Sequence, residues 1–158
     1  MMVVVNLVRL LVGMGVFKTE EDSVKYFNKV LQARGYTDIK RTDKFCYYDI
    51  EACKGDKSYR FELKRRNFKH TRYGDAVMEA HKFNHFIEDR DKYNYCYLVS
   101  FFEDCWTISN IKSPIGGSVI FGSRTTDFED KTIIKKDFVH YRQQVKFRYN
   151  LKVADKLD

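Results

Sequence analysis

One stretch of this chain, YYDIEACKGDKSYRFELKRR, constrains its fold more than any other. Residues 45–53 and 58–65 are rich in β-forming side chains, and the four residues between them, KGDK, have the composition of a tight turn. The two runs are therefore predicted to pair as an antiparallel hairpin whose turn is centred between Gly55 and Asp56.

The register of this hairpin brings charged side chains together. Asp49 faces Glu62 across the strands, Glu51 shares the face of Asp49, and Lys64 shares the face of Glu62. Because like charges directly opposite each other destabilise a sheet, the facing carboxylates need compensation from the neighbouring lysine or from a bound cation. Mg²⁺ suits that need, since it binds carboxylate oxygens and keeps several waters.

A carboxylate pair that holds Mg²⁺ can serve phosphodiester hydrolysis. The ion would lower the pKa of a bound water, while a lysine beside it would orient the nucleophile or stabilise the charge of the transition state. The alternative is a solvated hairpin, in which Asp49, Glu51, Arg60, Glu62 and Lys64 pair across the wet face of an antiparallel sheet.

Helical and β patterns surround the hairpin. Thr19 is the predicted N-cap of a helix that Gly35 ends, and apolar residues recur within it at helical spacing (Val24, Phe27, Val30 and Leu31). A second helix is predicted over residues 75–90, from steps of four, three and four (Ala76, Ala80, Phe83 and Ile87). Further strands are expected over 93–102, 106–111 and the second half of 137–151, with another short apolar run at 116–122.

This order of elements predicts a single α/β domain over residues 1–158, with a central mixed β-sheet flanked by helices. The length of 158 residues suits one domain, and no linker divides it. Lys and Arg number 29 against 22 Asp and Glu, which favours an acidic partner such as nucleic acid.

Residues 1–17 form an apolar N-terminal segment. It lacks the basic start of a secretion signal and carries Asn6 and Arg9 inside the apolar run. We expect a packing or dimer-forming helix, with a strand through Met2 to Val5 as the alternative, and no membrane partner. The four cysteines are scattered and are expected to be reduced thiols, which favours an intracellular setting, in the cytoplasm or with the nucleoid.

A basic stretch follows the hairpin. Residues 64–72 hold five Lys or Arg and no acidic residue, so they could grip phosphates through counterion release. The alternative is a solvated loop that joins the hairpin to the next helix. The cations expected to contact nucleic acid are Arg65, Arg66, Lys69 and Arg72, joined by Lys82 from the second helix; for Lys82, an exposed pair with Glu79 is the alternative.

The spacing of Asp49, twelve residues and then Glu62-Leu63-Lys64 resembles the PD-(D/E)XK nuclease superfamily, with its restriction-endonuclease-like fold. Small Holliday junction resolvases and phage or mobile-element endonucleases share this organisation. The resemblance covers about residues 19 to 100 and implies an αβββαβ core. It departs from the motif at Tyr48, which stands in the place of the proline.

The resemblance implies a role for each motif residue. Asp49 and Glu62 would be metal ligands, the Leu63 carbonyl would complete the inner shell, and Lys64 would be the catalytic lysine. Some members, archaeal Holliday junction resolvases among them, also use a glutamate of the first helix, for which Glu20 is the first candidate and Glu21 the second.

The function predicted from these residues is Mg²⁺-dependent endonucleolytic cleavage of DNA, duplex or branched, with Mn²⁺ expected to substitute. Two strands need two sites, so a homodimer is expected. The first alternative is a non-catalytic nucleic-acid-binding module that uses the basic 64–72 loop. The second is a protein-interaction domain that carries the motif by chance.

Overall fold

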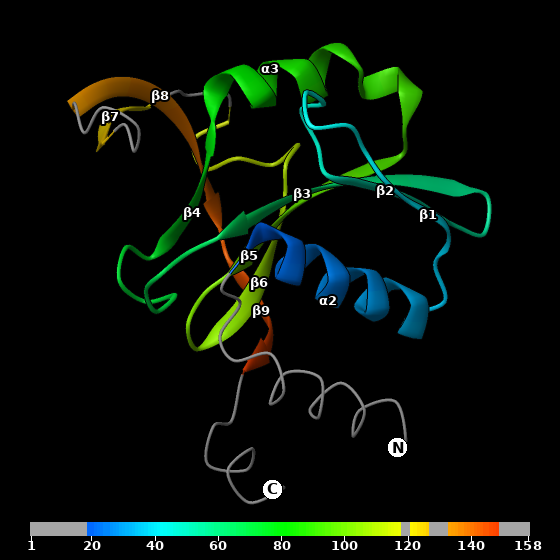
Figure 1. Ribbon diagram of the computed structural model, residues 1–158. Helices are drawn as coiled ribbons and strands as arrows, with labels where there is room; N and C mark the ends of the chain where they lie inside the picture. The colour runs from blue at the N-terminus through cyan, green and yellow to red at the C-terminus, as the bar shows by residue number, and fades with distance from the viewer. Residues whose placement is uncertain (1–18, 118–120, 127–132, 149–158) are drawn as a thin grey trace, which may run out of the picture.

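The computed structural model (Figure 1) describes residues 19–117, 121–126 and 133–148. The predicted N-terminal segment 1–17 lies outside these residues, as do part of the 116–122 run and the end of the 137–151 tail. Along the described chain the elements are α2 (Glu20–Ala33), β1 (Thr37–Arg41), β2 (Ile50–Lys54), β3 (Lys57–Arg65), β4 (Asp75–Glu79), α3 (Ala80–Glu88), the 3₁₀ helix η1 (Arg90–Lys92), β5 (Tyr95–Phe101), β6 (Cys105–Asn110), β7 (Phe121–Thr126), β8 (Ile133–Arg142) and β9 (Gln144–Arg148).

The main sheet has six strands in the order β1-β2-β3-β5-β6-β9. β3 and β5 run parallel, and the other neighbours in this sheet are antiparallel. A parallel pair needs a crossover, which the chain makes through a loop, β4 and α3. The predicted mixed sheet flanked by helices is therefore confirmed, and α2, β1, β2, β3, α3 and β5 follow one another in the implied αβββαβ order, with β4 inserted.

The predicted hairpin register is confirmed from Ile50, which pairs with Phe61, to Lys54, which pairs with Lys57. Gly55 supplies the left-handed conformation of the turn, with a φ of 60°. The predicted start of the first strand at Phe45 is wrong, because residues 44–49 form turns and bends before β2. These residues turn away from the sheet because the ring of Tyr47 packs against Phe86 of α3, with centroids 4.8 Å apart.

Helix α2 covers one face of the main sheet, as Figure 1 shows. Its N-cap is Thr19, as predicted: the Thr19 hydroxyl accepts from the backbone N–H of Asp22, and the Asp22 carboxylate accepts from the backbone of Thr19. The apolar stripe predicted for this helix is buried, and it meets the sheet residues Ile50, Ala52, Phe61, Leu63, Val99, Phe101 and Trp106.

Helix α3 and a second, three-stranded sheet, in the order β4-β8-β7, lie on the other side of the main sheet. Their shared core is fully buried at its centre, where Met78 of β4, Phe86 of α3, Leu98 of β5 and Tyr141 of β8 are inaccessible to solvent. The main sheet therefore has an apolar core on each face.

The helix predicted over residues 75–90 is wrong in its first five residues. Asp75–Glu79 form β4, which pairs with β8 so that Ala76 meets Tyr141 and Met78 meets Val139. The alternation of buried Ala76 and Met78 with half-buried neighbours is the burial pattern of a strand, and pairing with a distant strand outweighed a local spacing that also fits a helix.

The later strands follow the prediction more closely. β5 lies within the predicted 93–102 run, and β6 returns antiparallel beside it. The tail contributes β9 in the predicted second half of 137–151, whereas β8, which precedes it, was not predicted.

β1 was not predicted and forms one edge of the main sheet. Its pairing with β2 shifts register between Thr37 and Lys40, and Asp38 has a positive φ of 50°. None of the described helices is long and apolar enough to cross a membrane.

The cap of α2 gives a first prediction. Replacing Thr19 with Ala leaves the backbone N–H of Asp22 without its side-chain acceptor, so we expect a loss of about 1 kcal/mol in the free energy of unfolding. Thr19→Ser keeps the hydroxyl and should stay near the wild type. Urea denaturation of the three proteins measures the difference, and equal midpoints for Ala and wild type would contradict the capping role.

Candidate active site

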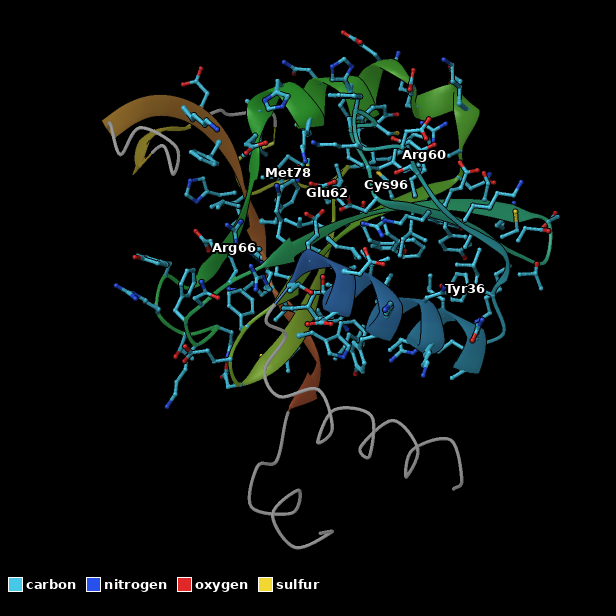
Figure 2. The ribbon with its side chains drawn as sticks, in the orientation of Figure 1. Tyr36, Arg60, Glu62, Arg66, Met78 and Cys96 are labelled. Atoms are coloured by element: carbon cyan, nitrogen blue, oxygen red, sulfur yellow. The ribbon has the colours of Figure 1, made fainter. Side chains whose placement is uncertain are left out.

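A cavity of about 230 Å³ opens at the end of β3, where the N-terminal turns of α2 and α3 approach the sheet. Figure 2 labels Glu62 between these two helices. The cavity is lined by Glu20, Ser23, Asp49, Glu62, Leu63, Lys64, Arg65 and Lys82. Four separate parts of the chain, α2, the bend before β2, β3 and α3, therefore contribute charged side chains to one hollow.

Asp49 is held in place by its own backbone and by the next strand. Its backbone N–H donates to the carbonyl of Phe61 at 2.9 Å, and its carbonyl accepts from the N–H of Thr42 at 2.9 Å. The carboxylate oxygen Oδ2 accepts from the backbone N–H of Leu63 at 2.7 Å. These bonds fix the carboxylate beside Glu62, as the hairpin register predicted, although Asp49 lies just before β2.

Glu62 is buried, with 1% of its surface exposed. Its oxygen Oε1 lies 2.5 Å from the ammonium of Lys82 and 3.3 Å from that of Lys64. Its other oxygen, Oε2, is buried and has no hydrogen-bond partner among the described residues. Such an unpaired carboxylate oxygen is costly in a protein interior, so the site holds a strong acceptor that is open to a cation.

The ionisation of Glu62 is finely balanced. Burial raises its pKa, and the neighbouring Asp49 carboxylate raises it further, while Lys64 and Lys82 oppose both effects; the result is a pKa of about 7. The carboxyl group is therefore half-ionised near neutral pH, and a positive charge placed at Oε2 would complete its ionisation.

Lys82 comes from the first turn of α3 and points at Glu62. Burial lowers its pKa, but the Glu62 carboxylate and the hydrogen bond to it outweigh burial, so the pKa of Lys82 is raised. The alternative of an exposed Glu79–Lys82 pair is not what forms, since the Glu79 carboxylate contacts His81 at 3.7 Å and Lys136 at 3.9 Å. Lys82 is instead a cation of the cavity.

The two glutamates proposed for the first helix lie in different places. Glu20 lines the cavity together with Asp49 and Glu62. Glu21 forms an ion pair with Arg41 of β1 and is half-exposed. The structure therefore brings Glu20, and not Glu21, to the carboxylate pair.

The cations predicted to contact nucleic acid lie in different places. Arg65 and Lys82 line the cavity, while Lys69 and Arg72 are exposed on the loop that follows β3. Arg66 is partly buried, and its guanidinium donates to the carbonyl of Val77 at 2.9 Å. Burial lowers the pKa of Arg66, and its hydrogen bond to Val77 ties the loop to β4.

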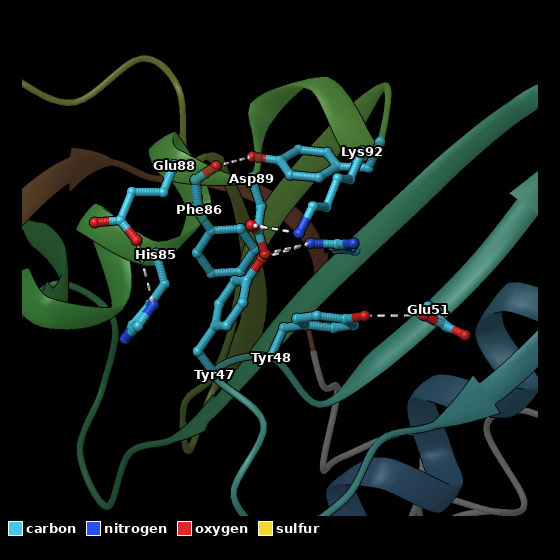
Figure 3. A network of polar contacts seen from close by, with 10 residues as sticks. Tyr47, Tyr48, Glu51, His85, Phe86, Glu88, Asp89 and Lys92 are labelled. Carbon is cyan, nitrogen blue, oxygen red and sulfur yellow. Dashed lines mark hydrogen bonds and ion pairs between the residues drawn. The ribbon is translucent and has the colours of Figure 1, made fainter.

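The solvated-hairpin alternative does not describe this face, because Glu62 is buried and Arg60 is enclosed by aromatic rings. The guanidinium of Arg60 lies 4.6 Å from the ring centre of Tyr48 and 4.8 Å from that of Tyr93. Arg60 also forms an ion pair with Asp89 at 3.3 Å, and Asp89 accepts from the Tyr47 hydroxyl at 2.6 Å, a contact drawn in Figure 3. This network holds the bend of residues 44–49 against α3 and so positions Asp49.

Glu51 belongs to this network and not to the cavity. Its carboxylate accepts from the Tyr48 hydroxyl at 2.9 Å, as Figure 3 shows, and it lines a separate hollow of about 210 Å³ with Arg60. Of the acidic residues of the hairpin, Asp49 and Glu62 therefore line the larger cavity and Glu51 lines the separate hollow.

A second group of donor side chains joins the loop after β3 to the turn after β5. His70 Nδ1 lies 2.5 Å from Asp104 Oδ2, the His70 backbone N–H donates to Asp104 Oδ1 at 3.0 Å, and the buried Cys105 is close by. Ligand atoms of the three residues lie within 4.8 Å of one another. The sequence analysis missed this group because its members are far apart in the chain. The His70–Asp104 hydrogen bonds account for the contact and anchor the loop.

The chain is similar in structure to the Holliday junction resolvase Hjc of the archaeon Archaeoglobus fulgidus. The likeness covers 73% of this chain and 84% of the resolvase, with a TM-score of 0.47 and 15% sequence identity. No family model matches the sequence, and no match is found among curated proteins.

The pKa of Glu62 gives a prediction for stability without metal. The native state keeps the Glu62 proton from its ordinary pKa of 4.5 up to about 7, whereas the unfolded state has lost it. The contribution of Glu62 to stability is therefore complete below pH 4.5 and falls as the pH rises to 7, by about 3 kcal/mol.

Urea denaturation in EDTA at several pH values measures this loss as the difference between the wild type and Glu62→Gln, which cannot ionise. The wild type should weaken relative to the variant as the pH rises through this range. Parallel pH profiles for the two proteins would contradict the shifted pKa.

Proposed function

We propose that this protein is a divalent-metal-dependent endonuclease that hydrolyses phosphodiester bonds in DNA. The observation that carries the proposal is the pairing, in one cavity, of the Asp49 carboxylate with a buried Glu62 carboxylate whose Oε2 has no partner among the described residues. Two carboxylates and two lysines around a hollow that can admit a phosphate are the parts that this chemistry needs.

The donor set fits a hard cation such as Mg²⁺, with Mn²⁺ as a substitute. Asp49 and Glu62 offer carboxylate oxygens, the backbone carbonyl of Leu63 lies between Glu62 and Lys64 in the chain, and Glu20 adds a carboxylate on the α2 side. When bound, the ion would supply a water of lowered pKa and positive charge beside the phosphate. Asp49 is already oriented by Leu63, which reduces the cost of assembling the site.

We infer separate roles for the two lysines. Lys64 follows Glu62 by two residues on β3, so its ammonium lies on the same face and can hold the attacking water or the phosphate oxygen as negative charge develops. Lys82 keeps Glu62 paired before substrate arrives and, from α3, can contact a phosphate oxygen at the cavity mouth.

The remaining cations extend this surface along the DNA backbone. Arg65 borders the cavity, and Lys69 and Arg72 are exposed just beyond it on the loop after β3. With a net charge of +7, the chain favours association with a polyanion. We propose DNA, duplex or branched, as the substrate and, from four cysteines that form no disulfide, an intracellular setting.

Cleavage tests the proposal directly. Asp49→Asn and Glu62→Gln should each reduce the cleavage rate of a supercoiled plasmid by roughly 10²- to 10⁴-fold, because each removes a charged ligand. Lys64→Ala should reduce it by at least roughly 10²-fold while leaving DNA binding largely intact. EDTA should abolish cleavage, and Mg²⁺ or Mn²⁺ should restore it.

Glu51→Gln is the matched control. It removes a carboxylate from the same hairpin, but Glu51 lies in the other hollow, and glutamine can still accept from Tyr48. Its cleavage rate should equal that of the wild type. DNA binding without any cleavage in either metal would replace the nuclease with the non-catalytic binding module, and no salt-dependent DNA binding at all would exclude both.

We further propose that the active form is a homodimer, because cutting both strands of a duplex or a junction requires two active sites. Sedimentation equilibrium should give about twice the 18.9 kDa mass of one chain, and plasmid cleavage should yield linear product early in the reaction. A monomeric mass, with nicked circles as the lasting product, would refute the dimer and leave the catalytic site unaffected.

A further inference from the structure

The loop of residues 66–74, between β3 and β4, has no regular secondary structure but is held at several points. The Arg66 backbone N–H donates to Phe101 at 2.7 Å, the Phe68 carbonyl accepts from the N–H of Glu103 at 3.1 Å, and His70 is bound by Asp104. At its far end, the side-chain amide of Gln143 donates to the carbonyls of His70 and Gly74, at 3.2 and 3.1 Å. The loop therefore presents its side chains from a fixed backbone.

Three of these side chains, Phe68, Arg72 and Tyr73, contact one another. The ring of Phe68 rests on the buried Phe102, with centroids 5.8 Å apart, and the ring of Tyr73 stands edge-on to Phe68 at 5.1 Å. The guanidinium of Arg72 lies 5.6 Å from the ring centre of Phe68 and 5.3 Å from that of Tyr73. We call Phe68, Arg72 and Tyr73 the aromatic platform.

The aromatic platform is open to solvent and positively charged. Tyr73 is 65% exposed, one of the most exposed large apolar side chains among the described residues. No acidic side chain in the described part of the chain forms an ion pair with Arg72 or Lys69. A planar cation and an aromatic ring that face solvent together suit a ligand with both a flat face and a negative charge.

The aromatic platform lies close to the proposed active site. Lys64 and Arg65 line the cavity, and the loop begins at the next residue. Even a fully extended chain would place the Cα of Phe68 no more than roughly 14 Å from that of Lys64. Since one strand of DNA advances roughly 3.4 Å per nucleotide, this Cα–Cα span corresponds to about four nucleotides, to which the reach of the side chains is added.

We propose that the aromatic platform stacks against an unpaired nucleobase of the DNA, so that the substrate of this nuclease is DNA whose strands separate next to the cut, such as a fork or a flap. Every base offers a flat face to an aromatic ring, whereas in a continuous duplex neighbouring base pairs cover those faces. Arg72 would stack with the base and pair with the adjoining phosphate. This inference rests on the proposed function and adds its substrate class.

Binding in EDTA tests the aromatic platform separately from cleavage. The probes are a forked DNA with two unpaired arms and a fully paired duplex of the same length, each labelled for fluorescence anisotropy. Tyr73→Ala should weaken binding to the fork by roughly 5- to 100-fold and leave duplex binding unchanged. Tyr73→Phe keeps the ring and should bind the fork as the wild type does.

Tyr95→Ala is the matched control. Tyr95 is also an exposed tyrosine, at 41%, but it starts β5 and pairs with Tyr59, at the end of the parallel strands opposite Lys64. Its removal should leave fork binding unchanged. A 2-aminopurine base placed in the unpaired arm should change its fluorescence on binding to the wild type and to Tyr73→Phe, but less with Tyr73→Ala.

Two results would overturn the inference. An equal loss on fork and duplex would make Tyr73 a general contact without preference for unpaired bases. No loss on either DNA would free the aromatic platform for another partner, such as a protein. Both results can occur while the wild type still cleaves in Mg²⁺, and a protein that binds forks through Tyr73 but never cleaves would instead refute the nuclease and keep the stacking site.

Discussion

The parallel pairing of β3 with β5 obliges the chain to return from one end of the main sheet to the other between Arg65 and Tyr95. An antiparallel partner would have needed only a short turn. The return path here contains the loop of residues 66–74, β4 and α3, and it lies on the face of the sheet that carries Glu62. The cavity therefore has one wall from the hairpin and another from the crossover, and neither piece makes the site alone.

Charge balance in the cavity depends on the same path. Glu62 is buried beside the Asp49 carboxylate, and both effects raise the pKa of Glu62 and so favour its neutral form. Lys64 arrives from the same strand and Lys82 from the crossover, at 3.3 and 2.5 Å from one carboxylate oxygen. The two ammonium groups let the protein fold around a buried acid with one oxygen still unpaired, which is the property that a cation site requires.

Local patterns in the sequence were sufficient for the elements that form by local interactions. The hairpin register followed from the turn at Gly55, and the start of α2 followed from Thr19 and Asp22. Where a distant partner decides the structure, local patterns failed. Residues 75–79 have spacings that suit a helix as well as a strand, and only β8, some sixty residues later, selects the strand.

In the candidate site, too, local features could be predicted from the sequence and features that depend on distant residues could not. The facing of Asp49 and Glu62 is local to the hairpin and could be read from spacing. The choice between Glu20 and Glu21 depends on Arg41 of β1, a strand that the sequence analysis did not foresee, and the bonds of His70 depend on Asp104. Contacts between residues so far apart leave no periodic signal in a single sequence.

The irregular edge strand β1 also limits how copies of this protein can meet. An edge with regular, unpaired backbone groups invites a strand from another molecule. β1 is short, its register shifts between Thr37 and Lys40, Asp38 departs from extended geometry, and its exposed residues are mostly charged. These features oppose continuation of the sheet from one molecule into the next at β1, so this edge is protected from fibrous aggregation, and an assembly of two chains is expected to form at another surface.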